Sequence, residues 1–142
     1  MPLQFDEHGV RFHYPEGWKL EREENDTGWT ITLQSPQTAF LVISVNEEMP
    51  SVDEVAETTL EALRSEYPDL EAEECVDTLA GQPAVGHDMQ FFSFDLTNTC
   101  KARSIYTDSG TMLVMWQAND LELPAYEPVL RAICASLEVD AE

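Results

Sequence analysis

Apolar and polar residues alternate with a period of two in the first third of the chain, which predicts β-strands with one buried face. The alternation covers residues 9–14 and 28–34. A nearly continuous apolar run over residues 39–45 is typical of a central strand covered on both faces. Because a Ser-Pro-Gln break at residues 35–37 separates the second strand from the third, these two are expected to form a hairpin.

After residue 50 the period lengthens to that of an amphipathic helix. Apolar residues recur at helical spacing between positions 52 and 63, and Ser51 followed by Glu54 has the pattern of a capping box. A Tyr-Pro pair at residues 67–68 predicts the end of this helix. Its outer side is acidic and includes Glu54, Glu57 and Glu61.

Four further strands follow from about residue 70, and short turns connect them into an antiparallel meander. In the Asp-Ser-Gly loop that ends at Gly110, the glycine is expected to adopt a positive φ. A second amphipathic helix over residues 126–137 closes the chain, with Pro124 or Pro128 in its first turn. The four strand runs are residues 70–79, 83–94, 99–107 and 111–118.

This order of elements predicts the α+β class, with an antiparallel sheet of about six or seven strands and flanking helices in an α/β/α sandwich. The 142 residues are of the usual size for one domain, so residues 1–142 are expected to form a single unit. A chain of this length buries enough surface to fold without a metal ion or disulfides.

Charge narrows the choice of partners, because 28 Asp and Glu stand against 7 Lys and Arg, giving a net charge of −21. DNA, RNA and anionic lipid need a basic footprint, so these partners are excluded. Residues 47–77 are especially acidic and carry one cation, Arg64. Three interpretations of this surface stay open: solubility in salt, attraction of a basic partner, and binding of divalent cations.

The sequence as given has neither a signal peptide nor 18 consecutive apolar residues, which predicts a cytoplasmic protein without membrane insertion; removal of an export segment is the alternative. Cys75, Cys100 and Cys134 are odd in number and widely spaced, so neither a disulfide framework nor a metal knuckle is expected. A reducing compartment suits them. Burial is expected to leave Cys100 and Cys134 inert, and neighbouring carboxylates are expected to raise the pKa of Cys75.

Signals for catalysis are weak, since the chain has neither a nucleophile elbow nor a phosphate-binding loop. The histidines are His8, His13 and His87, and the spacing of the first two puts them on opposite faces of a regular strand. No metal, cofactor or catalytic residue is therefore expected. The alternative is a hydrolase or lyase with His13 or His87 against a carboxylate in a cleft. The acidic runs at residues 21–26 and 71–77 lack a calcium-loop pattern and are expected to be solvated turns.

Three phenylalanines, Phe91, Phe92 and Phe94, fall within four residues of one predicted strand. Because side chains alternate between faces, they cannot all point into one core. Burial on a strand covered on both faces is one explanation. The other is a partner-binding patch in which Phe92 and Phe94 are exposed with Trp116 and Met112, since aromatic side chains carry much of the energy at protein interfaces.

Three motifs punctuate the chain: Phe12-x-Tyr14-Pro15-x-Gly17-Trp18, a central Gly81-x-Pro83-Ala84, and a last helix that ends Leu130-x-x-Ile133-x-x-Ser136-Leu137. With the elements between them, they resemble the PsbP-like superfamily over nearly the whole chain. That group includes the extrinsic photosystem II protein, the fungal import factor that binds the GTPase Ran, DcrB-like envelope proteins and Eag-type secretion chaperones. The resemblance implies an α/β/α sandwich without catalytic residues, hence a non-enzymatic accessory or binding protein.

Together these observations predict a cofactor-free protein-binding module of PsbP-like fold. Its apolar patch and the acidic helix face formed by Glu54, Glu57 and Glu61 are expected to select a basic or amphipathic protein partner. A salt-adapted or cation-binding surface remains the alternative use of the acids. The oligomeric state does not follow from these residues.

Overall fold

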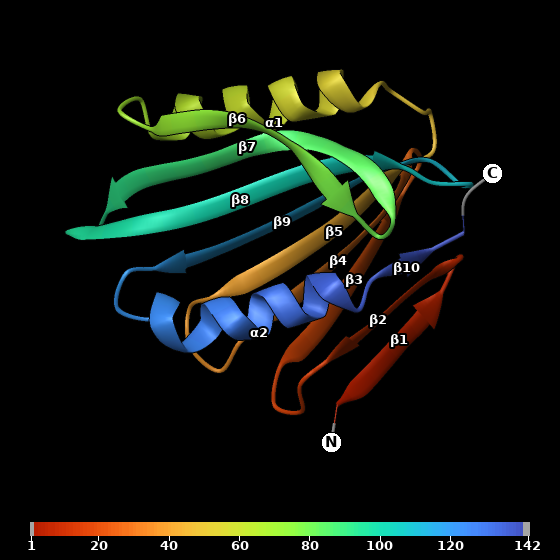
Figure 1. The fold of residues 1–142 in the computed structure, drawn as a ribbon, viewed down its shortest axis with the longest axis horizontal. Helices are drawn as coiled ribbons and strands as arrows, with labels where there is room; N and C mark the ends of the chain where they lie inside the picture. Colours follow the sequence, from red (N-terminus) through yellow and green to blue (C-terminus); the bar gives the residue numbers. More distant parts are fainter. Residues whose placement is uncertain (1, 141–142) are drawn as a thin grey trace.

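The computed structural model describes residues 2–140, which form three layers (Figure 1). Helix α1 covers one face of a seven-stranded antiparallel sheet, and helix α2 with a three-stranded sheet covers the other. The predicted α+β sandwich is confirmed. The elements are β1 Leu3–Glu7, β2 Val10–Tyr14, β3 Lys19–Asn25, β4 Gly28–Gln34, β5 Phe40–Asn46, α1 Val52–Glu66, β6 Glu71–Leu79, β7 Gln82–Ser93, β8 Leu96–Tyr106, β9 Thr111–Asn119, α2 Leu123–Ala135 and β10 Glu138–Val139.

The large sheet has the strand order β3-β4-β5-β9-β8-β7-β6. Strand β5 lies inside the sheet between β4 and β9, as the apolar run of residues 39–45 indicates, and β4 and β5 form the expected hairpin. Strands β6 to β9 form the expected meander. The predicted strand at residues 9–14 does not join this sheet, because β2 pairs instead with β1 and β10.

Strand β3 is absent from the elements predicted by periodicity, because it has no apolar stripe. It is an edge strand in which six of seven residues are exposed, so neither face requires alternation. Strand β6, at the opposite edge, carries four acidic residues and no Lys or Arg. The expectation of solvated turns at residues 21–26 and 71–77 is therefore wrong for most of both runs. Charged side chains at both edges discourage pairing with another sheet.

Both helices begin and end close to the predicted positions. The Ser51 hydroxyl accepts a hydrogen bond from the backbone N–H of Glu54 at 3.0 Å, and α1 ends where Tyr67 caps it. Helix α2 begins earlier than predicted, at Leu123, with Pro124 in its first turn. It ends at Ala135, so that the next residues can form β10 against β2.

Two hydrophobic cores lie on the two faces of the large sheet. The larger one packs α2 and the small sheet against strands β4, β5 and β9, and it includes Leu33, Ile43 and Leu130. The smaller one packs Leu60 of α1 against β7 and β8 and includes Met89. Each helix therefore buries its apolar side on its own face of the sheet.

Gly110 is required for a different reason from the one predicted. Its φ is not positive; that conformation belongs to Gly9, Gly17 and Gly81 among the glycines. A Cβ at Gly110 would instead lie 2.5 Å from the carbonyl oxygen of Asn46, the last residue of the neighbouring strand β5. Close approach of two backbones, rather than turn geometry, excludes a side chain there.

Candidate functional site

The hairpin between β7 and β8 ends in a tight turn at one end of the sheet (Figure 1). The aromatic ring of Phe94 is exposed at this turn. The last paired residues are Ser93 and Leu96, so Phe94 and Asp95 form a two-residue loop. Their φ values are 54° and 61°, as a type I′ turn requires at both central positions. Such turns favour Asn-Gly, whereas here Phe94 occupies the first position with 97% of its surface exposed.

The same hairpin exposes Phe92, which is 75% accessible and faces away from α1. Opposite it in register lies Thr97, whose carbonyl accepts the backbone N–H of Asp120 at 2.9 Å. The next residue, Leu121, is another exposed large apolar side chain, and the Asp120–Thr97 hydrogen bond places it beside this end of β8. We call Phe92, Phe94 and Leu121 the apolar tip.

Two of the residues expected in this patch are not part of it. Met112 and Trp116 are both buried in the larger core, so the prediction that they are exposed beside Phe92 and Phe94 is wrong. They lie on the face of β9 against which α2 packs, whereas the alternating Leu113 and Met115 point to the other face, toward the smaller core. Periodicity marks a β9 face as apolar, but it does not show that a helix covers this face.

The acidic helix residues Glu54, Glu57 and Glu61 are exposed on α1, as expected. Phe92 projects from the opposite face of the sheet, so the acidic helix face and the apolar tip are separate surfaces. The acids that adjoin the tip in the chain are Asp95 and Asp120, both exposed, and Glu122, which is partly buried. Residues 92–98 and 119–123 contain no Lys or Arg, so the tip itself is an apolar and anionic surface.

A partly buried ion-pair network crosses strands β6, β7 and β8 on the face that α2 covers in part. Arg103 contacts Asp77 through Nε at 3.0 Å and Asp88 through Nη2 at 2.9 Å. Lys101 lies 3.7 Å from the other oxygen of Asp88. Burial acts to raise the pKa of Asp88, but hydrogen bonding and charge from Arg103, with Lys101, outweigh it and lower that pKa. Asp88 therefore stays ionised at neutral pH, opposite the Arg103 guanidinium, whose pKa these contacts raise.

Neither the histidines nor the cysteines converge on a reactive centre. His87 is buried, His8 lies near Glu24 at the surface, and His13 is exposed. Within residues 2–140, no group of three or more His, Cys, Asp or Glu side chains is placed to hold a metal ion. Burial raises the pKa of Cys100 to about 12 and that of Cys134 to about 11, so both remain thiols at neutral pH.

Solved structures show that the chain has the PsbP-like fold. No family model and no curated protein matches the sequence. The resemblance stated from the motifs is thus confirmed at the level of fold. Likeness to the Ran-binding factor, to DcrB-like proteins and to Eag-type chaperones stays a prediction.

One of the similar structures is cyanobacterial PsbP from Synechocystis sp. PCC 6803, with a TM-score of 0.65, 12% identity, and coverage of 97% of this chain and 92% of that one. A Pseudomonas aeruginosa protein of unknown function, described as a putative regulator, superposes with a TM-score of 0.56, 17% identity, and 95% and 94% coverage. LpqN, involved in cell envelope biogenesis of Mycobacterium tuberculosis, superposes with a TM-score of 0.55 and 13% identity. The match covers 99% of this chain and 90% of LpqN. At these identities the likeness extends to the fold alone.

No helix within residues 2–140 is long and apolar enough to cross a membrane.

Proposed function

We propose that this chain is a non-enzymatic accessory protein that binds another protein through the apolar tip (Phe92, Phe94 and Leu121). The observation that carries the proposal is the position of Phe94, a fully exposed aromatic ring on a left-handed backbone. The partner is expected to present a basic segment with apolar side chains. The cytoplasmic compartment predicted from the sequence is part of the same proposal.

Phe94 is costly to the isolated fold in two respects. A non-glycine residue at positive φ is strained, by about 1 kcal/mol or more when it is bulky. Its ring also gains nothing from burial, since almost its whole surface is in water. Unfavourable residues held in an otherwise regular hairpin are typical of functional positions, and exposed aromatic rings are the usual anchors of protein interfaces.

The charge near the tip favours a cationic partner. Asp95 lies in the turn itself, Asp120 lies beside Thr97, and Glu71 pairs in register with Gln90, two residues before Phe92. The net charge of −21 extends this field over the molecule. Such a field accelerates encounter with basic surfaces and repels acidic ones, more strongly at low salt.

The test compares partner capture by wild type with capture by tip variants. Phe92→Ser and Phe94→Asn are expected to abolish retention of a partner that the immobilised wild type retains from native lysate. Val76→Ser is the matched control, because it removes an apolar side chain that is exposed on the edge strand β6. The partner's binding segment, mapped by a photo-crosslinker at position 94, is expected to be basic and amphipathic.

Three results would contradict the proposal: retention by both tip variants, equal loss by Val76→Ser, or an acidic mapped segment. A further variant with Glu54, Glu57 and Glu61 changed to Gln separates the two surfaces. Because α1 lies on the other face of the sheet, this variant is expected to slow association and to leave the tip crosslink in place.

A further inference from the structure

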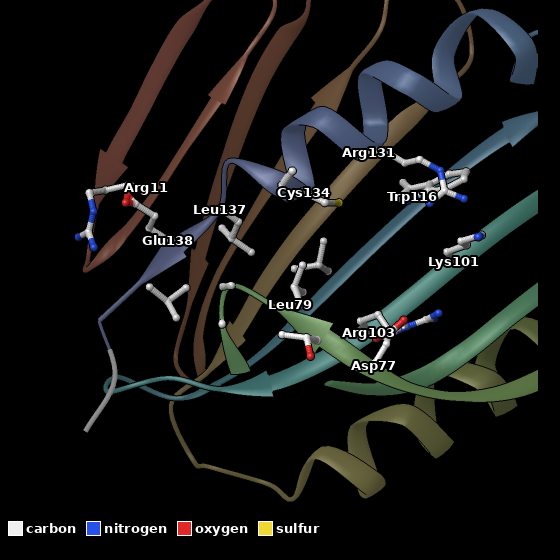
Figure 2. Close-up of a pocket in the computed structure, with 16 residues that line it drawn as sticks. Arg11, Asp77, Leu79, Lys101, Arg103, Trp116, Arg131, Cys134, Leu137 and Glu138 are labelled. Carbon is white, nitrogen blue, oxygen red and sulfur yellow. Dashed lines mark hydrogen bonds and ion pairs between the residues drawn. The ribbon is translucent and has the colours of Figure 1, made fainter. Parts of the chain in front are cut away.

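A second surface feature lies away from the tip, where α2 and β10 face strands β6, β8 and β9 across a cavity of about 690 Å³ (Figure 2). Sixteen of the 142 residues line it, yet they include four of the seven cations of the chain. Most of the few Lys and Arg residues in this chain therefore lie around one cavity. They are Arg11, Lys101, Arg103 and Arg131.

Two of these cations are already occupied by the protein. Arg103 donates to Asp77 and Asp88, and its Nη1 donates to the carbonyls of Ala102 at 2.9 Å and His87 at 3.3 Å. Arg11 is paired with Asp140 at 3.1 Å, at the far end of the cavity. Arg103 is thus a structural part of the wall.

The other two cations retain donors for a ligand. Lys101 is 3.7 Å from Asp88, beyond hydrogen-bond distance, and its Nζ lies 5.9 Å from the centre of the Trp116 ring. Arg131 is 60% exposed and holds only a 3.3 Å contact to Glu127, a surface pair that contributes little. Figure 2 shows Trp116 between these two cations, one on β8 and one on α2.

The remainder of the wall is mixed, because the carboxylates of Asp77 and Glu138 line it together with an apolar strip. Leu79, Val114 and Leu137 line the cavity beside Cys134, whose thiol is neutral because burial raises its pKa to about 11. A volume of about 690 Å³ lies within the usual range for small-molecule sites. The hollow therefore combines a cationic end with an apolar floor.

We propose that this cavity binds a small amphipathic anion, with its carboxylate or phosphate group between Lys101 and Arg131 and its apolar chain along Leu79, Val114 and Leu137. Charge complementarity carries the choice of ligand, because the head group would replace the weak contacts to Asp88 and Glu127 by charge-assisted hydrogen bonds. The site is independent of the apolar tip and of any protein partner.

Isothermal titration calorimetry with decanoate and with decyl phosphate tests the proposal, and decyltrimethylammonium serves as the probe of opposite charge. Decanoate or decyl phosphate is expected to bind and the cation is not. The better of the two anions identifies the head group. Lys101→Met and Arg131→Gln are each expected to weaken binding about tenfold, the loss of one charge-assisted hydrogen bond.

Arg64→Gln is the matched control, since it removes one exposed cation from α1 on the other face of the sheet and is expected to leave affinity unchanged. Glu127→Gln frees Arg131 and is expected to tighten binding. Absence of heat with both anions, equal binding of the cationic probe, or equal loss in Arg64→Gln and Arg131→Gln would overturn the proposal. Arg131 is exposed, so its variant reports on the site even if Lys101→Met fails to fold.

Discussion

The ring of Phe91 stacks on that of Tyr67 with centroids 4.0 Å apart and planes 19° from parallel. Tyr67 caps α1, and Phe91 lies on β7, so this contact fastens the end of the helix to the sheet. The adjacent Phe92 leaves β7 on the other face and remains in water. Two neighbouring phenylalanines therefore have opposite roles, one in the core and one at the surface.

This relationship predicts opposite effects of the same substitution. Phe91→Ala should lower the free energy of unfolding by about 3 kcal/mol, because it removes a buried ring and the stacking of this ring on Tyr67. Phe92→Ala should change it by less than about 0.5 kcal/mol, as is usual for exposed side chains. Urea unfolding of both variants checks this. Similar losses in the two would show that Phe92 is packed in solution.

The turn at Phe94 predicts a stabilising change. Replacing Phe94-Asp95 by Asn-Gly should raise the free energy of unfolding by about 1 kcal/mol, since Asn and Gly relieve the strain of two positive φ values. Thermal unfolding measures the gain, with Phe92→Ser as a surface control that leaves the turn intact. A lower melting temperature in the double variant would mean that the Phe94 ring stabilises the fold.

Glu122 predicts an acid-dependent stability. Its carboxylate accepts hydrogen bonds from the backbone N–H groups of Thr38 and Ala39, each at 3.1 Å, and from Asn119. Burial acts to raise the pKa of Glu122, but these bonds outweigh it and lower that pKa. The stability they provide is therefore present above the unfolded pKa of about 4.3 and is lost as pH falls through the lower folded value.

Glu122→Gln should accordingly cost about 1 kcal/mol at neutral pH, because one amide oxygen cannot accept all of these bonds. The difference in the free energy of unfolding between Glu122→Gln and wild type should shrink as the solution is acidified. Melting temperatures measured across the acid range test both statements. Glu21→Gln, on the exposed edge strand β3, is the control and should show no such convergence. A constant difference at every pH would contradict the assignment.

The cysteines should react with iodoacetamide in a fixed order. Cys75 is the most accessible, although burial and the charge of Asp88 raise its pKa against the opposing effect of Arg103. Cys134 should follow, and fully buried Cys100 should react only when the protein unfolds. Mass spectrometry of peptides over time gives the three rates. Rapid labelling of Cys100 in the native protein would contradict the order.

Local periodicity was sufficient for most of the elements. Strands β2, β4, β5, β7, β8 and β9 and both helices follow from spacing, because each has one face in a core and that face must be apolar. Strand β6 was also predicted, within residues 70–79, although none of its residues is buried. Strands β1, β3 and β10 could not be predicted from the spacing of apolar residues. Strand β3 is exposed on both faces, and β10 has two residues that form a strand only because β2 lies beside them.

The sequence by itself thus determined the α+β class and the helix boundaries within a few residues, but it left open whether the surplus phenylalanine among Phe91, Phe92 and Phe94 is buried or exposed. Tertiary structure alone decided that α2 covers Trp116, that Phe92 and the acidic face of α1 lie on opposite sides of the sheet, and that Lys101 and Arg131 meet at one cavity. The physical reason is separation along the chain. Periodicity reports whether a residue is buried, whereas which residues meet depends on strand order, which is set by contacts between distant segments.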